Sequence, residues 1–127
     1  MGHSLGKVFS VHHGVAVGIF IPCTLQYYSK VTDKYLEICK ALEIEARTKE
    51  ESLARLVKRV RALISEVDVP LTLKDLGISE EDFKENFEKL VRYAYEDPSN
   101  FQNPRPITME EYEKFCRYAY TGRDIDF

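Results

Sequence analysis

Apolar residues recur every three or four positions through much of the chain after Thr32, which is the spacing of an amphipathic helix. The clearest stripe consists of Leu53, Leu56, Val57, Val60, Leu63, Ile64 and Val67. Thr48 and Glu51 have the spacing of a capping box, in which the Thr hydroxyl accepts the amide of Glu51 and the Glu carboxylate reaches back to the amide of the cap residue. Because Pro70 cannot continue a helix, we expect one long helix that begins after Thr48 and buries this stripe.

Three further segments show the same helical spacing. Ser79, followed by acidic residues that favour the positive end of a helix dipole, opens one of them; its apolar stripe is Phe83, Phe87, Leu90, Val91 and Ala94. Thr108 and Glu111 form a second capping box, and Gly122 is suited to end that helix in a left-handed conformation. A shorter helix is expected from about Asp33 to Leu42.

The first thirty residues follow a different pattern, since no Lys, Arg, Asp or Glu lies between Lys7 and Lys30. The run from Val15 to Ile21 is too short for periodicity to distinguish a buried strand from a fully buried helix. A helix is favoured because a lone strand would have no visible partner, and Pro22 should then kink it or divide it. The sequence thus predicts an all-α fold, a bundle of about five to six helices, with residues 1–127 as a single domain.

Composition and charge exclude several classes of function. The net charge is only −3 and no basic stripe is present, which argues against a nucleic-acid partner. The longest charge-free apolar run, Val15 to Cys23, is too short to span a bilayer, and no signal peptide is recognisable. The three cysteines are widely spaced and lack a C-x-x-C pair, as in reduced proteins. We therefore expect a cytoplasmic protein with no nucleic-acid or membrane partner.

The candidate chemistry lies in the opening segment, which holds all three histidines next to or near glycines: His3, His12 and His13. A transition-metal site needs three or four ligands, yet no H-x-x-x-H, H-E-x-x-H or carboxylate cluster accompanies them. On residue types alone, structural histidines are favoured over ligands, and both readings stay open. Two connections rich in Pro, Asn or Gly, Asp68 to Ile78 and Asp97 to Ile107, could border a site or simply join helices.

The order of these motifs resembles iron-containing (group III) alcohol dehydrogenases. The segment Gly2 to Gly6 (GHSLG) is followed seven residues later by His13-Gly14 and then by the apolar run that ends at Ile21-Pro22. Further blocks agree in order with the family's pattern: Lys34-Tyr35-Leu36, Asp68-Val69-Pro70, Leu73 to Ile78, Glu81-Asp82-Phe83, Asn103 to Pro106 and Thr108 to Glu111. The resemblance therefore covers nearly the whole chain and is to the C-terminal helical domain only.

The resemblance implies an NAD(P)-dependent oxidoreductase of small alcohols or aldehydes. In that family an N-terminal α/β domain binds the dinucleotide, and the helical domain contributes to a divalent metal site, Fe²⁺ or Zn²⁺, made by an aspartate and three histidines. His13 matches the last of these histidines, and His3 matches a histidine associated with proton relay. Another ligand histidine would fall four residues before His3, ahead of Met1, and the other two ligands further upstream. Whether Ser99 or Asn100 borders the substrate pocket stays open.

We therefore expect a truncated or split alcohol dehydrogenase that is inactive alone, because it has one metal ligand and no dinucleotide site. Without the N-terminal domain, the apolar segment Val15 to Ile21 should be partly uncovered. The chain should then associate, either as a homo-oligomer or with a separately encoded N-terminal dinucleotide-binding domain. The alternative is a non-enzymatic helical interaction or oligomerisation module derived from the family. A small independent metalloprotein would require a symmetric oligomer that gathers several copies of His13.

Overall fold

The computed structural model describes residues 1–127, and it contains helices and no strands. The elements are α1 (Gly2–Phe9), α2 (His13–Tyr28), α3 (Tyr35–Ala41), α4 (Lys49–Glu66), α5 (Glu80–Tyr95), the 3₁₀ helix η1 (Pro98–Gln102) and α6 (Met109–Thr121). The predicted all-α fold of about five to six helices is confirmed. None of the helices combines the length and the apolar character needed to cross a bilayer.

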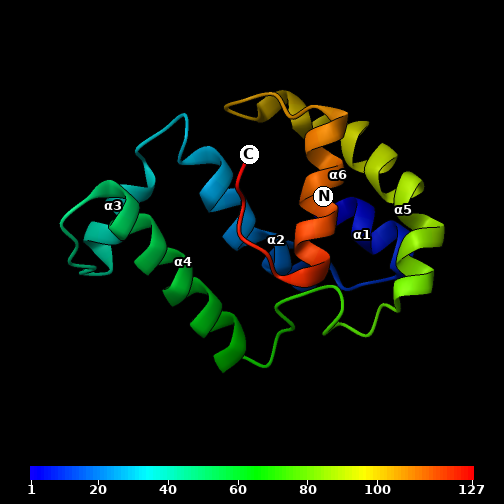
Figure 1. The fold of residues 1–127 in the computed structure, drawn as a ribbon, viewed down its shortest axis with the longest axis horizontal. Helices are drawn as coiled ribbons and strands as arrows, with labels where there is room; N and C mark the ends of the chain where they lie inside the picture. The colour runs from blue at the N-terminus through cyan, green and yellow to red at the C-terminus, as the bar shows by residue number, and fades with distance from the viewer.

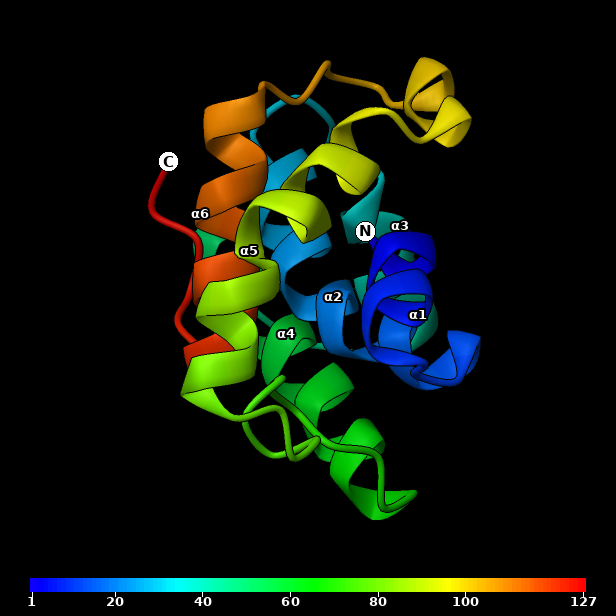
Figure 2. The ribbon, with the colours of Figure 1, turned by 90° about the vertical axis from the view of Figure 1, so that its right-hand side faces the viewer.

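The helices form two groups that α2 joins (Figure 1). Helices α3 and α4 pack on each other at one end of the molecule, whereas α1, α5 and α6 gather at the other. Figure 2 shows α5 and α6 side by side. Helix α1 packs on α5 as well as on α2. The main core lies within the second group and α2; it comprises Leu5, Ala16, Ile19, Phe20, Leu73, Ile78, Phe83, Leu90, Val91, Ala94, Tyr112, Cys116 and Ala119.

Helix α2 is partly buried and continues through Pro22 without dividing. Ala16, Ile19 and Phe20 are buried in the core. Val17 and Ile21, in contrast, are each 39% exposed, so the expectation of a fully buried helix is wrong on one face. The reason is geometric, because α1, α4 and α6 pack against α2 from only some of its sides.

Helix α4 buries less of its apolar stripe than the sequence predicts. Leu56, Val57 and Ile64 are buried, but Leu63 and Val67 are 50% and 60% exposed. Its packing partners are α2 and α3, and Figure 1 shows its C-terminal end reaching away from both. Periodicity identifies the face of a helix that is able to pack, but not how much of that face finds a neighbour.

The observed helix caps differ from the predicted ones in one detail. Thr108 and Glu111 form the full reciprocal capping box. Thr48 accepts the amide of Glu51 at 3.1 Å, but the Glu51 carboxylate accepts the amide of Arg47 at 2.8 Å rather than that of Thr48. The second half of the predicted capping box at α4 is therefore wrong, although the helix begins where the sequence indicates.

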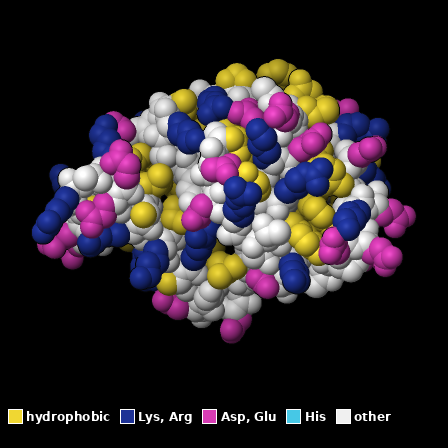
Figure 3. Space-filling view, viewed as in Figure 1, with side chains coloured by type: hydrophobic (Ala, Val, Ile, Leu, Met, Phe, Trp, Pro, Cys, Tyr) yellow, Lys and Arg dark blue, Asp and Glu magenta, His cyan; other side chains and the backbone are white.

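The surface is a mixture of charges. Figure 3 shows basic and acidic side chains interspersed over one face, with apolar patches between them. All three cysteines are buried and free, and burial raises the pKa of the Cys116 thiol to about 12. These thiols serve as small core residues, because a thiol with so high a pKa is a poor nucleophile.

Leu90→Ala should lower the free energy of unfolding by about 2–5 kcal/mol, because it leaves a cavity in the main core. Leu90 is completely buried on α5. The matched control, Leu42→Ala, removes the same atoms from a side chain that is 52% exposed and should change stability by less than about 0.5 kcal/mol. Urea unfolding followed by circular dichroism measures both, and equal losses would contradict this placement of the core.

A second prediction concerns Glu111, which ties the connection before α6 to the body of the protein. Its carboxylate pairs with Arg105 and accepts the Thr108 amide at 2.9 Å, and the Arg105 guanidinium lies 4.3 Å from the centre of the Tyr27 ring. Burial acts to raise the pKa of Glu111, but these donors outweigh burial and hold the pKa below 4.5. The stabilisation is thus present above about pH 4.5 and is lost as the pH falls below it.

Glu111→Gln should therefore cost about 1–3 kcal/mol near pH 7, because a hydrogen-bonded charge pair is broken. Its unfolding free energy should also fall less than that of the wild type when the pH is lowered from about 7 to about 3. Chemical unfolding at both pH values checks this. A variant that keeps the wild-type pH dependence would show that Glu111 contributes none of it.

Candidate functional site

The first turns of α1 and α2 bring two of the predicted site residues together. The rings of His3 and His13 stack, with their centroids 4.9 Å apart and their planes inclined by 18°. Gly2 makes this approach possible, since a Cβ atom there would lie 2.8 Å from the Val17 side chain. The glycine beside His3 therefore has a steric role, which is to let the start of α1 lie directly on α2.

The stacked geometry limits what the two histidines do together. Imidazole binds a metal through a nitrogen lone pair in the plane of its ring, and near-parallel stacked rings direct these lone pairs along separate planes. His3 and His13 are thus not arranged as two ligands of one ion. His12, the third histidine, is the N-cap residue of α2 and is exposed, and it takes no part in the stack.

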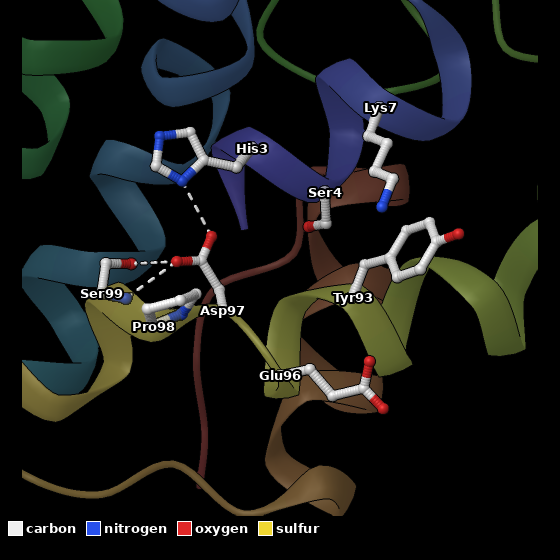
Figure 4. Close-up of a pocket in the computed structure, with 8 residues that line it drawn as sticks. All are labelled: His3, Ser4, Lys7, Tyr93, Glu96, Asp97, Pro98 and Ser99. Atoms are coloured by element: carbon white, nitrogen blue, oxygen red, sulfur yellow. Dashed lines mark hydrogen bonds and ion pairs between the residues drawn. The ribbon is translucent and has the colours of Figure 1, made fainter.

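Asp97, 94 positions after His3 in the sequence, completes the site. Its Oδ2 accepts a hydrogen bond from His3 Nδ1 at 2.8 Å, and its Oδ1 accepts the amide and the hydroxyl of Ser99 at 2.9 and 2.7 Å (Figure 4). These residues border an open pocket of about 560 Å³. The lining residues are His3, Ser4, Lys7, Tyr93, Glu96, Asp97, Pro98 and Ser99.

The carboxylate of Asp97 is ionised and largely buried. Its side chain is 8% exposed, whereas that of His3 is 64% exposed. Burial acts to raise the pKa of Asp97, but the hydrogen bonds from Ser99 and His3 outweigh it and lower the pKa to about 2. An ionised carboxylate has no proton to give, so His3 Nδ1 must be the donor in their hydrogen bond.

Local structure fixes Asp97 independently of His3. Asp97 follows α5 and is the N-cap of η1, with Pro98 at the first position of that helix. The Asn100 amide donates to the last carbonyls of α5, those of Ala94 and Tyr95, both at 2.8 Å. The Tyr112 hydroxyl donates to Asn100 Oδ1 at 2.5 Å, which ties the same turn to α6. The turn that carries Asp97 is thus tied to both flanking helices.

Sequence reasoning found part of this site. It singled out His3 and His13, and it left open whether Ser99 or Asn100 borders the substrate pocket. In the structure Ser99 lines the pocket beside His3, and Asn100 holds the turn. It missed Asp97 as a partner of His3, although Asp-Pro-Ser is a recognisable helix-capping sequence. It also missed Lys7, whose Nζ lies 3.9 Å from the centre of the Tyr93 ring.

The residues of this chain do not by themselves form a metal site. Nowhere do three or more His, Cys, Asp or Glu side chains lie where they could jointly hold an ion. Structural and catalytic zinc sites, for comparison, use three or four protein ligands.

Sequence comparison assigns the family. Residues 1–120 match the family described as "Fe-containing alcohol dehydrogenase family, C-terminal". The chain is 32% identical to the NADPH-dependent butanol dehydrogenase of Clostridium saccharobutylicum, over 100% of this chain and 33% of the relative. It is 32% identical to lactaldehyde reductase of Escherichia coli K12, over 94% of this chain and 31% of the relative.

The aldehyde-alcohol dehydrogenase of Streptococcus pneumoniae is 28% identical, over 96% of this chain and 16% of the relative. The chain thus spans a third or less of the length of these relatives, in their C-terminal part. The family description specifies iron, and no match supports the zinc alternative. The chain therefore belongs to the iron-containing alcohol dehydrogenase family and corresponds to its C-terminal domain.

Proposed function

We propose that residues 1–127 act as the helical, metal-side domain of an NAD(P)-dependent alcohol dehydrogenase that interconverts a small alcohol and its aldehyde. The observation that carries the proposal is the His3–His13 stack at the start of α1 and α2, in a chain that matches this family over residues 1–120. Nicotinamide chemistry requires a dinucleotide-binding domain, which this helical fold does not supply. The domain would therefore work only in an assembled enzyme.

Within this assembly the two histidines have different roles. His13 is exposed at the first position of α2 and contributes one imidazole to the iron site. His3 acts in proton relay, a role supported by its hydrogen bond to Asp97 and by its exposed ring. No group of three or more His, Cys, Asp or Glu side chains could hold the ion, so the proposal requires further ligands from another domain.

We also propose that the exposed side of α2 binds the partner domain or a second copy of the chain. Val17, Ile21 and Leu25 line a concave, largely apolar surface together with Met1 and Phe20. This surface adjoins the histidine stack, because Gly2 also lines it. Apolar surface beside a polar site is typical of an interface at which two domains share a reaction centre.

Association through this surface can be tested on residues 1–127 alone. We expect sedimentation velocity to show concentration-dependent self-association, because the apolar surface of α2 has no other cover. Ile21→Gln, at a side chain 39% exposed, should weaken this association. Leu63→Gln is the matched control on α4, at a side chain 50% exposed. A monomer at every concentration that binds no hydrophobic dye would contradict the proposed interface.

The enzymatic role is tested by joining residues 1–127 to a dinucleotide-binding domain. Residues 1–127 alone should not oxidise alcohols in the presence of Fe²⁺ and NAD(P)⁺. Fused behind the N-terminal part of the Clostridium saccharobutylicum butanol dehydrogenase, the same residues should bind about one Fe²⁺ per chain and reduce an aldehyde with NADPH. Elemental analysis and NADPH absorbance measure the two quantities.

His13→Ala in this fusion should abolish both iron binding and activity, whereas His12→Ala, the neighbouring exposed histidine, should preserve iron binding. Equal iron contents in the two variants would show that His13 is not a ligand. Activity of residues 1–127 alone would overturn the proposed need for a second domain. A folded fusion without iron or activity would favour a helical interaction module that has lost the chemistry.

A further inference from the structure

We infer that Asp97 is a positioning residue that holds His3 in the tautomer with its proton on Nδ1, so that the Nε2 lone pair faces outward to accept a proton. The tautomer itself is a property of this chain. Its use in proton relay rests on the proposed function. The two Asp97 oxygens bind different partners, the Asp97 side chain is more buried than that of His3, and the His3 ring has Nε2 on the edge opposite to Asp97.

The two carboxylate oxygens of Asp97 are used separately. Oδ1 accepts both hydrogen bonds from Ser99, which completes the cap of η1. A capping role requires nothing more. Oδ2 is left to accept from His3, which lies 94 positions away in the sequence. The fold thus places Oδ2, which the cap of η1 does not use, within hydrogen-bond distance of the His3 imidazole on α1.

Burial decides which partner sets the geometry. The Asp97 side chain is 8% exposed, on a turn that Asn100 anchors to α5 and α6, whereas His3 is 64% exposed on the short helix α1. The carboxylate is therefore the fixed group and the imidazole adapts to it. Because the hydrogen bond at one ring nitrogen determines which nitrogen carries the proton, a fixed acceptor at Nδ1 selects the Nδ1–H tautomer.

The orientation of the ring places Nε2 on the edge opposite to Asp97, in a side chain that is 64% exposed. Figure 4 shows the second ring nitrogen of His3 on the side opposite to Asp97. The His13 ring, stacked at 4.9 Å, covers one face of the His3 ring and restricts its rotation. Nε2 is thus the nitrogen that can exchange a proton with a bound alcohol, and Asp97 keeps its lone pair free for that purpose.

Asp97→Asn distinguishes positioning from capping. The Asn side-chain oxygen can replace Oδ1 as acceptor from Ser99, because Asn is as good an N-cap as Asp. The amide NH₂ then occupies the place of Oδ2 and donates to His3, which requires an unprotonated Nδ1. The substitution should therefore leave the fold intact and invert the tautomer. Ser99→Ala, which removes one donor to Oδ1 and leaves the carboxylate, should preserve the wild-type tautomer.

The tautomer is read from long-range ¹H–¹⁵N spectra of the uniformly labelled 127-residue chain, at a pH at which its imidazoles are neutral, with His3 assigned by comparison with His3→Gln. We expect Nδ1–H in the wild type and in Ser99→Ala, and Nε2–H in Asp97→Asn, with unchanged circular dichroism. An Nε2–H wild type, or one tautomer in both the wild type and Asp97→Asn, would overturn the inference. If Asp97→Asn unfolds, Asp97→Glu serves as the second variant, because it keeps a carboxylate. Loss of the Nδ1–H tautomer in Asp97→Glu would count against the inference that a carboxylate acceptor at Nδ1 selects it.

The relay role is tested separately in the fused enzyme. There Asp97→Asn should lower kcat by about 100-fold or more, the usual loss when a positioned acid–base group is disabled, with iron content unchanged. An unchanged kcat together with an inverted tautomer would overturn the relay role of His3 in the proposed function, and would leave the assignment of Asp97 supported. The two claims therefore fail independently.

Discussion

The fold depends on the burial of one side of α2 between two groups of helices that otherwise share little contact. Ala16, Ile19 and Phe20 belong to the main core. Helix α2 also packs on α4, which forms a separate small cluster with α3 that comprises Tyr35, Cys39 and Leu56. A helix in this position must be uncharged and densely apolar on its buried side, as Ala16, Ile19 and Phe20 are. The same placement fixes the start of α2, and hence His13, at the edge of the core.

The site follows from this arrangement because three chain segments meet at that edge. Gly2 lets α1 lie on α2, which brings His3 to His13. The α1–α5 contact then brings His3 to the end of α5, where the chain turns into η1 and Asp97 caps it. His3, His13 and Asp97 therefore all lie at helix ends, where backbone groups without partners in the helix can be capped by side chains. The core behind these ends makes the arrangement rigid, while the outward side stays open.

Local signals in the sequence were sufficient for the helices after Thr32. Capping residues such as Thr108 and Ser79 marked helix starts because their effect is confined to one turn. The exposure of Val17 and Leu63 could not be predicted, since periodicity does not reveal which faces find neighbours. The family resemblance identified His3 and His13 but carried no information about Asp97. Their pairing across 94 positions is tertiary, and only the packing of α1 on α5 creates it.

The unequal burial of His3 and Asp97 has a consequence for how such a site tolerates change. A buried carboxylate that lost its partners would be costly, so its stability must come from donors that are always present. Ser99 provides two such donors from within the same turn, so Oδ1 of Asp97 keeps its hydrogen bonds whether or not His3 is engaged. A movement of His3 would therefore remove the hydrogen bond at Oδ2 but leave the cap of η1 in place. A fixed acceptor behind an adaptable imidazole separates the stability of the fold from the chemistry at the surface of the domain.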